Sequence, residues 1–100
     1  MTEMNTSIEI YVALSNESDL ANVEEIVRTA LLEVNGTLET VRTVRDHGLT
    51  GEEVALSFEA SFAAGVPVEG VKALMYSRLE KRVRNGTVTR VEVDEVFGAA

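Results

Sequence analysis

Apolar and polar residues alternate in two stretches of this 100-residue chain, as expected for strands that bury one face. In residues 7–14 the apolar positions on one side are Ile8, Ile10, Val12 and Leu14. In residues 54–62 they are Val54, Leu56, Phe58, Ala60 and Phe62. Because successive side chains of a strand point to opposite faces, both stretches are predicted to be strands with a second, more polar face.

Two other stretches place apolar residues three or four positions apart, which is typical of helices with one buried side. The first stretch predicts a helix over residues 17–35, with apolar positions at Leu20, Val23, Ile26, Val27, Ala30, Leu31 and Val34. In the second stretch, Pro67 suits the first helical position, because that position needs no N–H donor. The apolar positions that follow it are Val68, Val71, Leu74, Met75, Leu79 and Val83.

Each predicted helix runs into the same phrase, Asn-Gly-Thr, at residues 35–37 and again at residues 85–87. Gly36 and Gly86 are therefore predicted to be the left-handed residues that end the two helices. A stretch rich in β-branched residues follows each phrase, over residues 37–45 and 87–96. In the first of these stretches Leu38 and Val41 are three positions apart, which predicts a β-bulge.

The predicted order of elements is strand, helix, strand, strand, helix, strand, with a hairpin loop over residues 46–51. This order is typical of the ferredoxin-like βαββαβ fold, a split βαβ arrangement. Right-handed crossovers then predict a four-stranded antiparallel sheet in the order 4-1-3-2 with both helices on one face. We expect one domain over residues 1–100, in which residues 1–6 form a flexible N-terminus.

Composition narrows the classes of function. The hydrophobic fraction of 45% supports a core, and the absence of Cys excludes disulfides and thiolate chemistry. The formal net charge of −8 opposes binding to nucleic acid or to anionic lipid. The longest uncharged stretch, residues 60–68, is far shorter than the roughly 20 apolar residues that cross a bilayer. We therefore expect no nucleic-acid partner, no membrane contact and a cytoplasmic location.

The sheet face away from the helices is the predicted site of function. Small side chains with few charges on an uncovered face favour a covering partner or a second copy of the chain. The residues predicted to form this interaction surface are Glu9, Tyr11, Ala13, Ala55, Ser57 and Glu59. The two edge strands offer a second route to self-association. The leading hypothesis is a non-enzymatic protein-protein interaction module that forms a homodimer or binds another protein.

No group of residues predicts catalysis, a cofactor or a metal site. His47, the only histidine, adjoins Asp46 in the predicted hairpin, and a general base needs a nearby nucleophile that the sequence does not indicate. The acidic groups around Glu52 and Glu92 match no metal-binding loop. A basic cluster near the end of the second helix comprises Arg78, Lys81, Arg82 and Arg84. It could bind phosphate, but complementarity to the negative helix end explains it more simply.

The turn after the first strand is similar in part to that of ligand-sensing ACT domains, because it keeps an acid and a leucine, Asp19 and Leu20, although it lacks their glycine. This resemblance implies an alternative function, a regulatory domain that binds a small molecule near residues 15–19.

A further alternative is an acidic, phage-encoded inhibitor of a basic host protein. The carboxylates expected to imitate nucleic-acid charge are Glu17, Asp19, Glu24, Glu25 and Glu33.

Overall fold

The computed structural model describes residues 6–48, 51–63 and 65–96, and describes residues 46–48 and 51–53 by their backbone alone. Seven elements follow one another: β1 (Thr6–Leu14), the 3-10 helix η1 (Glu17–Asp19), α1 (Leu20–Glu33), β2 (Thr37–Gly48), β3 (Gly51–Phe62), α2 (Val68–Arg84) and β4 (Val88–Val96). The predicted βαββαβ order is confirmed. The expected flexible N-terminus falls on residues 1–5, outside the described residues, and on Thr6, the first residue of β1.

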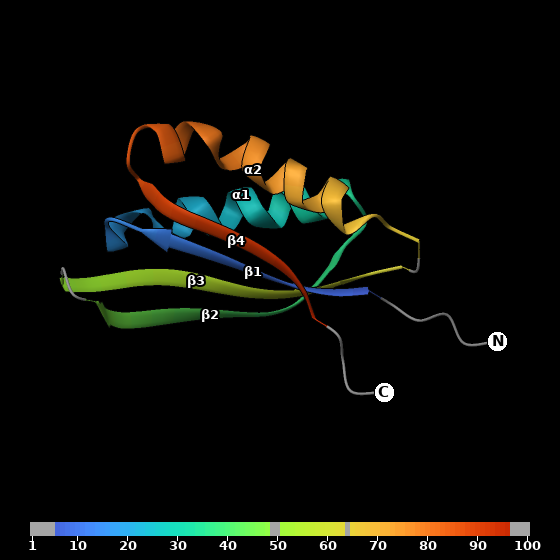
Figure 1. The fold of residues 1–100 in the computed structure, drawn as a ribbon, viewed down its shortest axis with the longest axis horizontal. Coiled ribbons are helices and arrows are strands. Elements are labelled where there is room, and N and C mark those ends of the chain that lie inside the picture. The colour runs from blue at the N-terminus through green and yellow to red at the C-terminus, as the bar shows by residue number, and fades with distance from the viewer. Residues whose placement is uncertain (1–5, 49–50, 64, 97–100) are drawn as a thin grey trace.

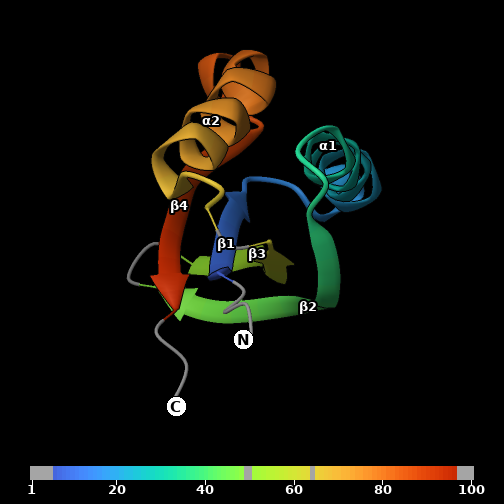
Figure 2. The same ribbon diagram turned by 90° about the vertical axis from the view of Figure 1, so that its right-hand side faces the viewer.

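The four strands form one antiparallel sheet in the order β2-β3-β1-β4, which is the predicted order read from the other edge. Both helices lie on the same side of this sheet (Figure 1), and none of the seven described elements lies over the opposite face (Figure 2). Figure 2 also shows the strong twist of the sheet between β2 and β4. We call the uncovered side the open face and the other side the helix-covered face.

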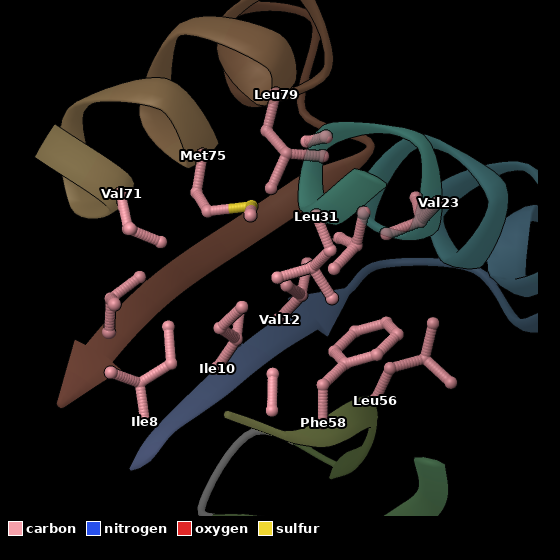
Figure 3. Close-up of a cluster of buried hydrophobic side chains, with 14 of the residues drawn as sticks. Ile8, Ile10, Val12, Val23, Leu31, Leu56, Phe58, Val71, Met75 and Leu79 are labelled. Carbon is pink, nitrogen blue, oxygen red and sulfur yellow. The ribbon is translucent and has the colours of Figure 1, made fainter. Parts of the chain in front are cut away.

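The core lies between the helices and the helix-covered face (Figure 3). β1 contributes Ile8, Ile10 and Val12, which are at most 1% exposed, and Phe58 of β3 is fully buried. From the helical layer, α2 contributes the buried Met75, at the centre of its apolar stripe. Burying a large apolar side chain stabilises the folded state by roughly 1.5–3 kcal/mol, so this two-layer contact is the main driving force for the fold.

The first helix begins later than predicted. Residues 17–19 form η1, in which the side chain of Asn16 accepts a hydrogen bond of 3.0 Å from the Ser18 N–H. α1 then starts at Leu20 and ends at Glu33, so the prediction of one helix over residues 17–35 was wrong at both ends. The second helix is also one residue shorter at its start, because Pro67 is extended and serves as the N-cap.

The predicted hairpin loop over residues 46–51 was wrong in extent. β2 continues through Asp46, His47 and Gly48, and β3 begins at Gly51, which lies opposite Gly48. Ladder hydrogen bonds between two strands outweigh the turn propensity of single glycines, so the strands extend. The predicted bulge is confirmed, because the β2-β3 register shifts between Leu38 and Thr40.

The two Asn-Gly-Thr phrases end their helices differently. In the first, Asn35 and not Gly36 has a positive φ of 54°, and Gly36 N–H donates to the Leu31 carbonyl at 2.8 Å. This is a Schellman motif with asparagine in the left-handed position. In the second, Gly86 has the positive φ, 84°, as predicted. The prediction for Gly36 was therefore wrong by one residue.

Gly36 has a different physical role, which is close packing. A Cβ atom added at Gly36 would lie 2.5 Å from Cε1 of Phe62, a ring that is 2% exposed. We expect Gly36→Ala to lower the free energy of unfolding by about 1–3 kcal/mol, because the ring must leave its packed position. Chemical denaturation monitored by circular dichroism measures this change.

Gly70→Ala is the matched control. Gly70 lies in α2, and its added Cβ would make only an ordinary contact of 3.5 Å with Cγ of Pro67. We expect this substitution to raise the free energy of unfolding by about 0.5–1 kcal/mol through helix propensity. Equal midpoints for the two variants would contradict the packing role of Gly36.

Candidate functional site

The open face is built from alternate residues of all four strands, opposite one another in register. From the central strands it takes Ser7, Glu9, Tyr11, Ala13, Ala55, Ser57, Glu59 and Ser61. From the edge strands it takes Thr40, Arg42, Val44, Arg90, Glu92, Asp94 and Val96. All six residues of the predicted interaction surface lie on this face, in three facing pairs: Glu9 with Glu59, Tyr11 with Ser57, and Ala13 with Ala55.

These six residues are not equally accessible. Ala13 and Ala55 are fully buried and Ser57 is 5% exposed, although no helix covers them. Glu9 and Glu59 are half-buried. Small side chains on a sheet are shielded by longer neighbours on the same strands and on the strands beside them. A partner on this face would therefore touch the longer side chains rather than the small ones at its centre.

Tyr11 stands at the centre of the open face, between Ser57 on one side and Glu92 on the other. The guanidinium of Arg90 lies over the Tyr11 ring, 5.2 Å from its centroid. The Nε of Arg90 is also 3.5 Å from a carboxylate oxygen of Glu92. Arginine stacked on an aromatic ring is a common pre-ordered contact surface, worth about 0.5–1 kcal/mol at an exposed site.

A row of carboxylates crosses the open face next to Tyr11. Glu9 lies directly opposite Glu59 on one side and opposite Asp94 on the other, so three neighbouring strands each contribute one carboxylate. Beside this row is a hollow of about 190 Å³, and Glu9, Glu59 and the bulge residue Glu39 line it together with Val96. We call Glu59, Glu9 and Asp94 the carboxylate row.

Like charges on directly opposite strand positions are destabilising, by a few tenths of a kcal/mol or more per pair. Arg42 offsets part of this repulsion, because its Nη2 lies 3.9 Å from a carboxylate oxygen of Glu59. Glu9, at the centre of the row, has no ion-pair partner within the part of the chain that the structure describes. The row is thus a local cost to stability and a region of negative potential.

The basic residues of the chain do not form one patch. Arg42 and Arg90 lie on the open face, whereas Arg45 lies on the helix-covered face and forms an ion pair with Glu17. The hydrogen bond from Arg45, and secondly its charge, hold the pKa of Glu17 below its ordinary value. This pair ties the start of the first helical segment to β2.

The predicted basic cluster at the end of α2 is divided in two. Arg78 pairs with Glu33 across the helices, and Arg84 pairs with Glu80 on α2 itself. The other two members, Lys81 and Arg82, make no ion pair with any residue that the structure describes. They line a groove between α1 and α2 on the outer surface of the helical layer.

The acidic strip predicted to imitate nucleic acid is partly neutralised. Glu17, Glu24 and Glu33 have cationic partners, which are Arg45, Arg28 and Arg78 respectively. Of the five carboxylates in that hypothesis, only Asp19 and Glu25 have no described ion pair. The strip therefore offers less unpaired charge to a basic partner than the sequence indicates.

Several other predicted features lie in the strand ends that face the β2-β3 connection. The backbones of Asp46, His47, Glu52 and Glu53 lie in strands, but their side chains are outside the described residues. Within the described residues, no group of three or more His, Cys, Asp or Glu side chains is arranged to hold a metal ion. Neither of the α-helices in the described part of the chain is sufficiently long and apolar to cross a membrane.

The two edge strands differ in their surroundings. On β4, the Val91 carbonyl accepts a hydrogen bond of 3.2 Å from the Tyr76 hydroxyl, which belongs to α2. On β2, the bulge between Leu38 and Thr40 interrupts the regular ladder. A covering side chain and a bulge are both features that reduce pairing between sheet edges, so neither edge is an unobstructed template for a second copy.

Arg42, Arg90, Glu39 and Asp94 were not among the predicted surface residues. The alternation around Asp94 indicates which residues share a face of β4, but not that Asp94 lies opposite Glu9. That pairing depends on the register of β1 against β4, which shifts between Ala13 and Leu14.

Comparison with protein-family models gives no match, and comparison with curated protein sequences gives none either. Solved structures do match. The C-terminal domain of the MgtC protein from Mycobacterium tuberculosis aligns with a TM-score of 0.67 and 12% identity, over 96% of this chain and 93% of that one.

Two further structures come from signalling proteins. The P2 domain of the chemotaxis kinase CheA, in complex with the response regulator CheY, from Thermotoga maritima aligns with a TM-score of 0.56 and 17% identity, over 93% of this chain and 100% of that one. A putative PII-like signalling protein from Thermus thermophilus aligns with a TM-score of 0.53 and 18% identity, over 96% of this chain and 90% of that one. Other matches align this chain with only 48% or 28% of a longer chain.

At these identities the likeness shows the fold alone. It confirms the predicted ferredoxin-like arrangement, because the C-terminal MgtC domain and the PII-like protein align over nearly the whole of both chains. Two of these neighbours are named as signalling proteins, a chemotaxis kinase domain and a putative PII-like protein.

Repulsion within the carboxylate row should lower the stability of the folded state. We expect Glu9→Gln to raise the free energy of unfolding by about 0.2–1 kcal/mol at neutral pH and low salt, because it removes two like-charge contacts. Salt that shortens the Debye length from about 10 Å to about 3 Å should shrink this gain. Urea denaturation at two salt concentrations measures it. Glu95→Gln is the control, because Glu95 lies opposite Ile8 rather than a carboxylate; the same gain there would contradict the prediction.

The Glu17–Arg45 pair makes a pH prediction. Because the pKa of Glu17 is lowered in the folded state, the pair contributes stability above the unfolded-state pKa and loses it as the pH falls through the lowered value. Arg45→Gln should raise the pKa of Glu17 toward its ordinary value and weaken this part of the acid dependence. An NMR titration of the Glu17 carboxyl tests it, with Arg84→Gln as a variant that should leave Glu17 unmoved.

Proposed function

We propose that this chain is a non-enzymatic interaction module that binds another protein through its open face. The observation that carries this proposal is a four-stranded face that no described helix covers, crossed by a carboxylate row and centred on the stacked pair Tyr11 and Arg90. Aromatic and arginine side chains are among the residue types that most often anchor protein interfaces, and here Tyr11 is half-buried while Arg90 is exposed above it.

The charge of the open face favours one kind of partner. The carboxylate row and the neighbouring Glu39 place four carboxylates at one end of the face, while Arg42 and Arg90 lie beside them. A partner that presents lysine or arginine side chains would relieve the repulsion within the row. The hollow beside Glu9 has an aliphatic wall at Val96, which suits the methylene stem of such a side chain.

A second copy of the chain is a less suitable occupant. Two copies that meet face to face bring two carboxylate rows into one interface, and removing these charges from water is costly without paired cations. The predicted homodimer thus becomes the competing hypothesis. The two hypotheses differ in their salt dependence. Added salt should weaken the binding of a basic partner, because it screens attraction, and should strengthen face-to-face self-association, because it screens repulsion.

The structural neighbours support an interaction role in general terms. One of them, the CheA P2 domain, was solved in complex with the response regulator CheY, so in that structure a domain of this fold is bound to another protein. A cytoplasmic location and the absence of a nucleic-acid partner stay predictions, based on composition.

A binding experiment tests the proposal with a short oligolysine peptide as the probe. We expect amide shifts in an NMR titration to concentrate at Glu9, Tyr11 and Glu59. The double variant Glu9→Gln/Glu59→Gln should bind about tenfold more weakly, which corresponds to about 1.4 kcal/mol. The matched variant Glu24→Gln/Glu25→Gln removes the same charge from α1 and should bind almost as the parent does.

Equal losses of affinity in the two variants would mean that peptide binding depends only on net charge, and would contradict a site on the open face. Sedimentation of the chain without peptide separates the competing hypothesis. A dimer that strengthens with added salt and dissociates in Tyr11→Arg would favour self-association over a basic partner.

A further inference from the structure

Residues of α1 and α2 together line a groove on the helical layer. This layer lies on the opposite side of the sheet from the open face (Figure 2). Two adjoining hollows, of about 300 Å³ and about 320 Å³, make up this groove. Asn22 of α1 and Arg82 of α2 line both hollows, so the two hollows adjoin each other. Together they fall within the size range of small-molecule sites, roughly 300–1,000 Å³.

The α2 wall of the groove is basic. Arg78, Lys81 and Arg82 are three and four residues apart, so they project from one side of the helix. Arg78 is engaged by Glu33 at one end of the groove. Lys81 and Arg82 have no ion-pair partner among the described residues, although the chain has nearly two acids for every base.

Complementarity to the negative end of α2 explains why bases occur in its last turn, as Arg84 illustrates. It does not explain why two of them converge on the same hollow as a side-chain amide. Asn22, whose side-chain amide makes no described hydrogen bond, lines both hollows together with Arg82, and Asn85 lines the second hollow together with Lys81.

The α1 wall is of a different character. Ile26 gives the first hollow an apolar surface, and Thr29 adds a hydroxyl. Glu25 in the first hollow and Asp19 in the second have no described ion pair. The groove thus places unpaired cations on one wall and unpaired carboxylates on the other, with an apolar patch between them.

We propose that this groove binds a small molecule that carries a phosphate or carboxylate group and, at some distance from it, an amino group. Lys81 and Arg82 bind the anionic group through charge-assisted hydrogen bonds. The body of the ligand lies on Ile26, and its amino group donates to Glu25 or Asp19. A purely anionic ligand would meet those carboxylates unfavourably, so the amino group is part of the recognition.

The site is independent of the proposed interaction face, because it lies on the other layer and shares no residue with it. The shallow groove leaves much of a ligand in solvent, and we therefore expect affinities in the weaker range for small molecules.

Three probes distinguish the chemistry. Adenosine monophosphate carries a phosphate and an exocyclic amino group, ribose 5-phosphate carries only the phosphate, and 4-aminobutyrate carries a carboxylate with an ammonium group at the other end of its carbon chain. Binding is measured by NMR titration of amide and side-chain resonances. We expect resonance shifts at Asn22, Ile26 and Arg82. We also expect at least one of the two amino-bearing probes to bind more tightly than ribose 5-phosphate does.

The double variant Lys81→Gln/Arg82→Gln should weaken that binding by at least about tenfold. Its control is Arg28→Gln/Lys72→Gln, which removes two positive charges from the same helices but outside the groove, and should retain the parent affinity. Glu25→Gln should weaken the binding of the amino-bearing probe, whereas the affinity for ribose 5-phosphate should stay the same or rise.

Saturating titrations with no shift for any probe would overturn the proposal. It would also be overturned if the control variant lost as much affinity as the groove variant, because binding would then follow net charge alone.

Discussion

The apolar side of β1 is the constraint on which the rest of this structure depends. Ile8, Ile10 and Val12 are buried beneath both helices, and β1 is hydrogen-bonded on both edges, to β3 and to β4. Because strand side chains alternate strictly, burying these three residues forces Glu9 and Tyr11 onto the opposite face. The position of the carboxylate row on the open face is thus a consequence of how the core is packed.

The carboxylate row illustrates how a stable fold tolerates a locally unfavourable surface. The helix-covered face buries large apolar side chains, and that gain exceeds the few tenths of a kcal/mol lost where Glu9 meets Glu59 and Asp94. Small residues at the centre of the open face add to the effect, since they leave the charged side chains standing above them. Departures of this kind from the most stable sequence are typical of surfaces that bind something.

Much of the fold was readable from sequence. Alternation located β1 and β3, three-and-four spacing located both helices, and the irregular spacing of Leu38 and Val41 indicated the bulge, because each signal arises from neighbours along the chain. The element order and right-handed crossovers then limited the topology to a few arrangements, among which the ferredoxin-like order was predicted. By the same local reasoning, the six surface residues around Tyr11 were assigned to the correct face.

Tertiary structure alone determined which residues meet on each face, because strand register and side-chain packing depend on residues that are distant in the sequence. Register brought Glu9, Glu59 and Asp94 into one row, and packing against longer neighbours buried Ala13 and Ala55 on an uncovered face. Likewise, the close approach of the Phe62 ring explains Gly36, and Asn35 takes the left-handed position that the local pattern had given to that glycine. Local patterns specify which way a side chain points, but not what it meets there.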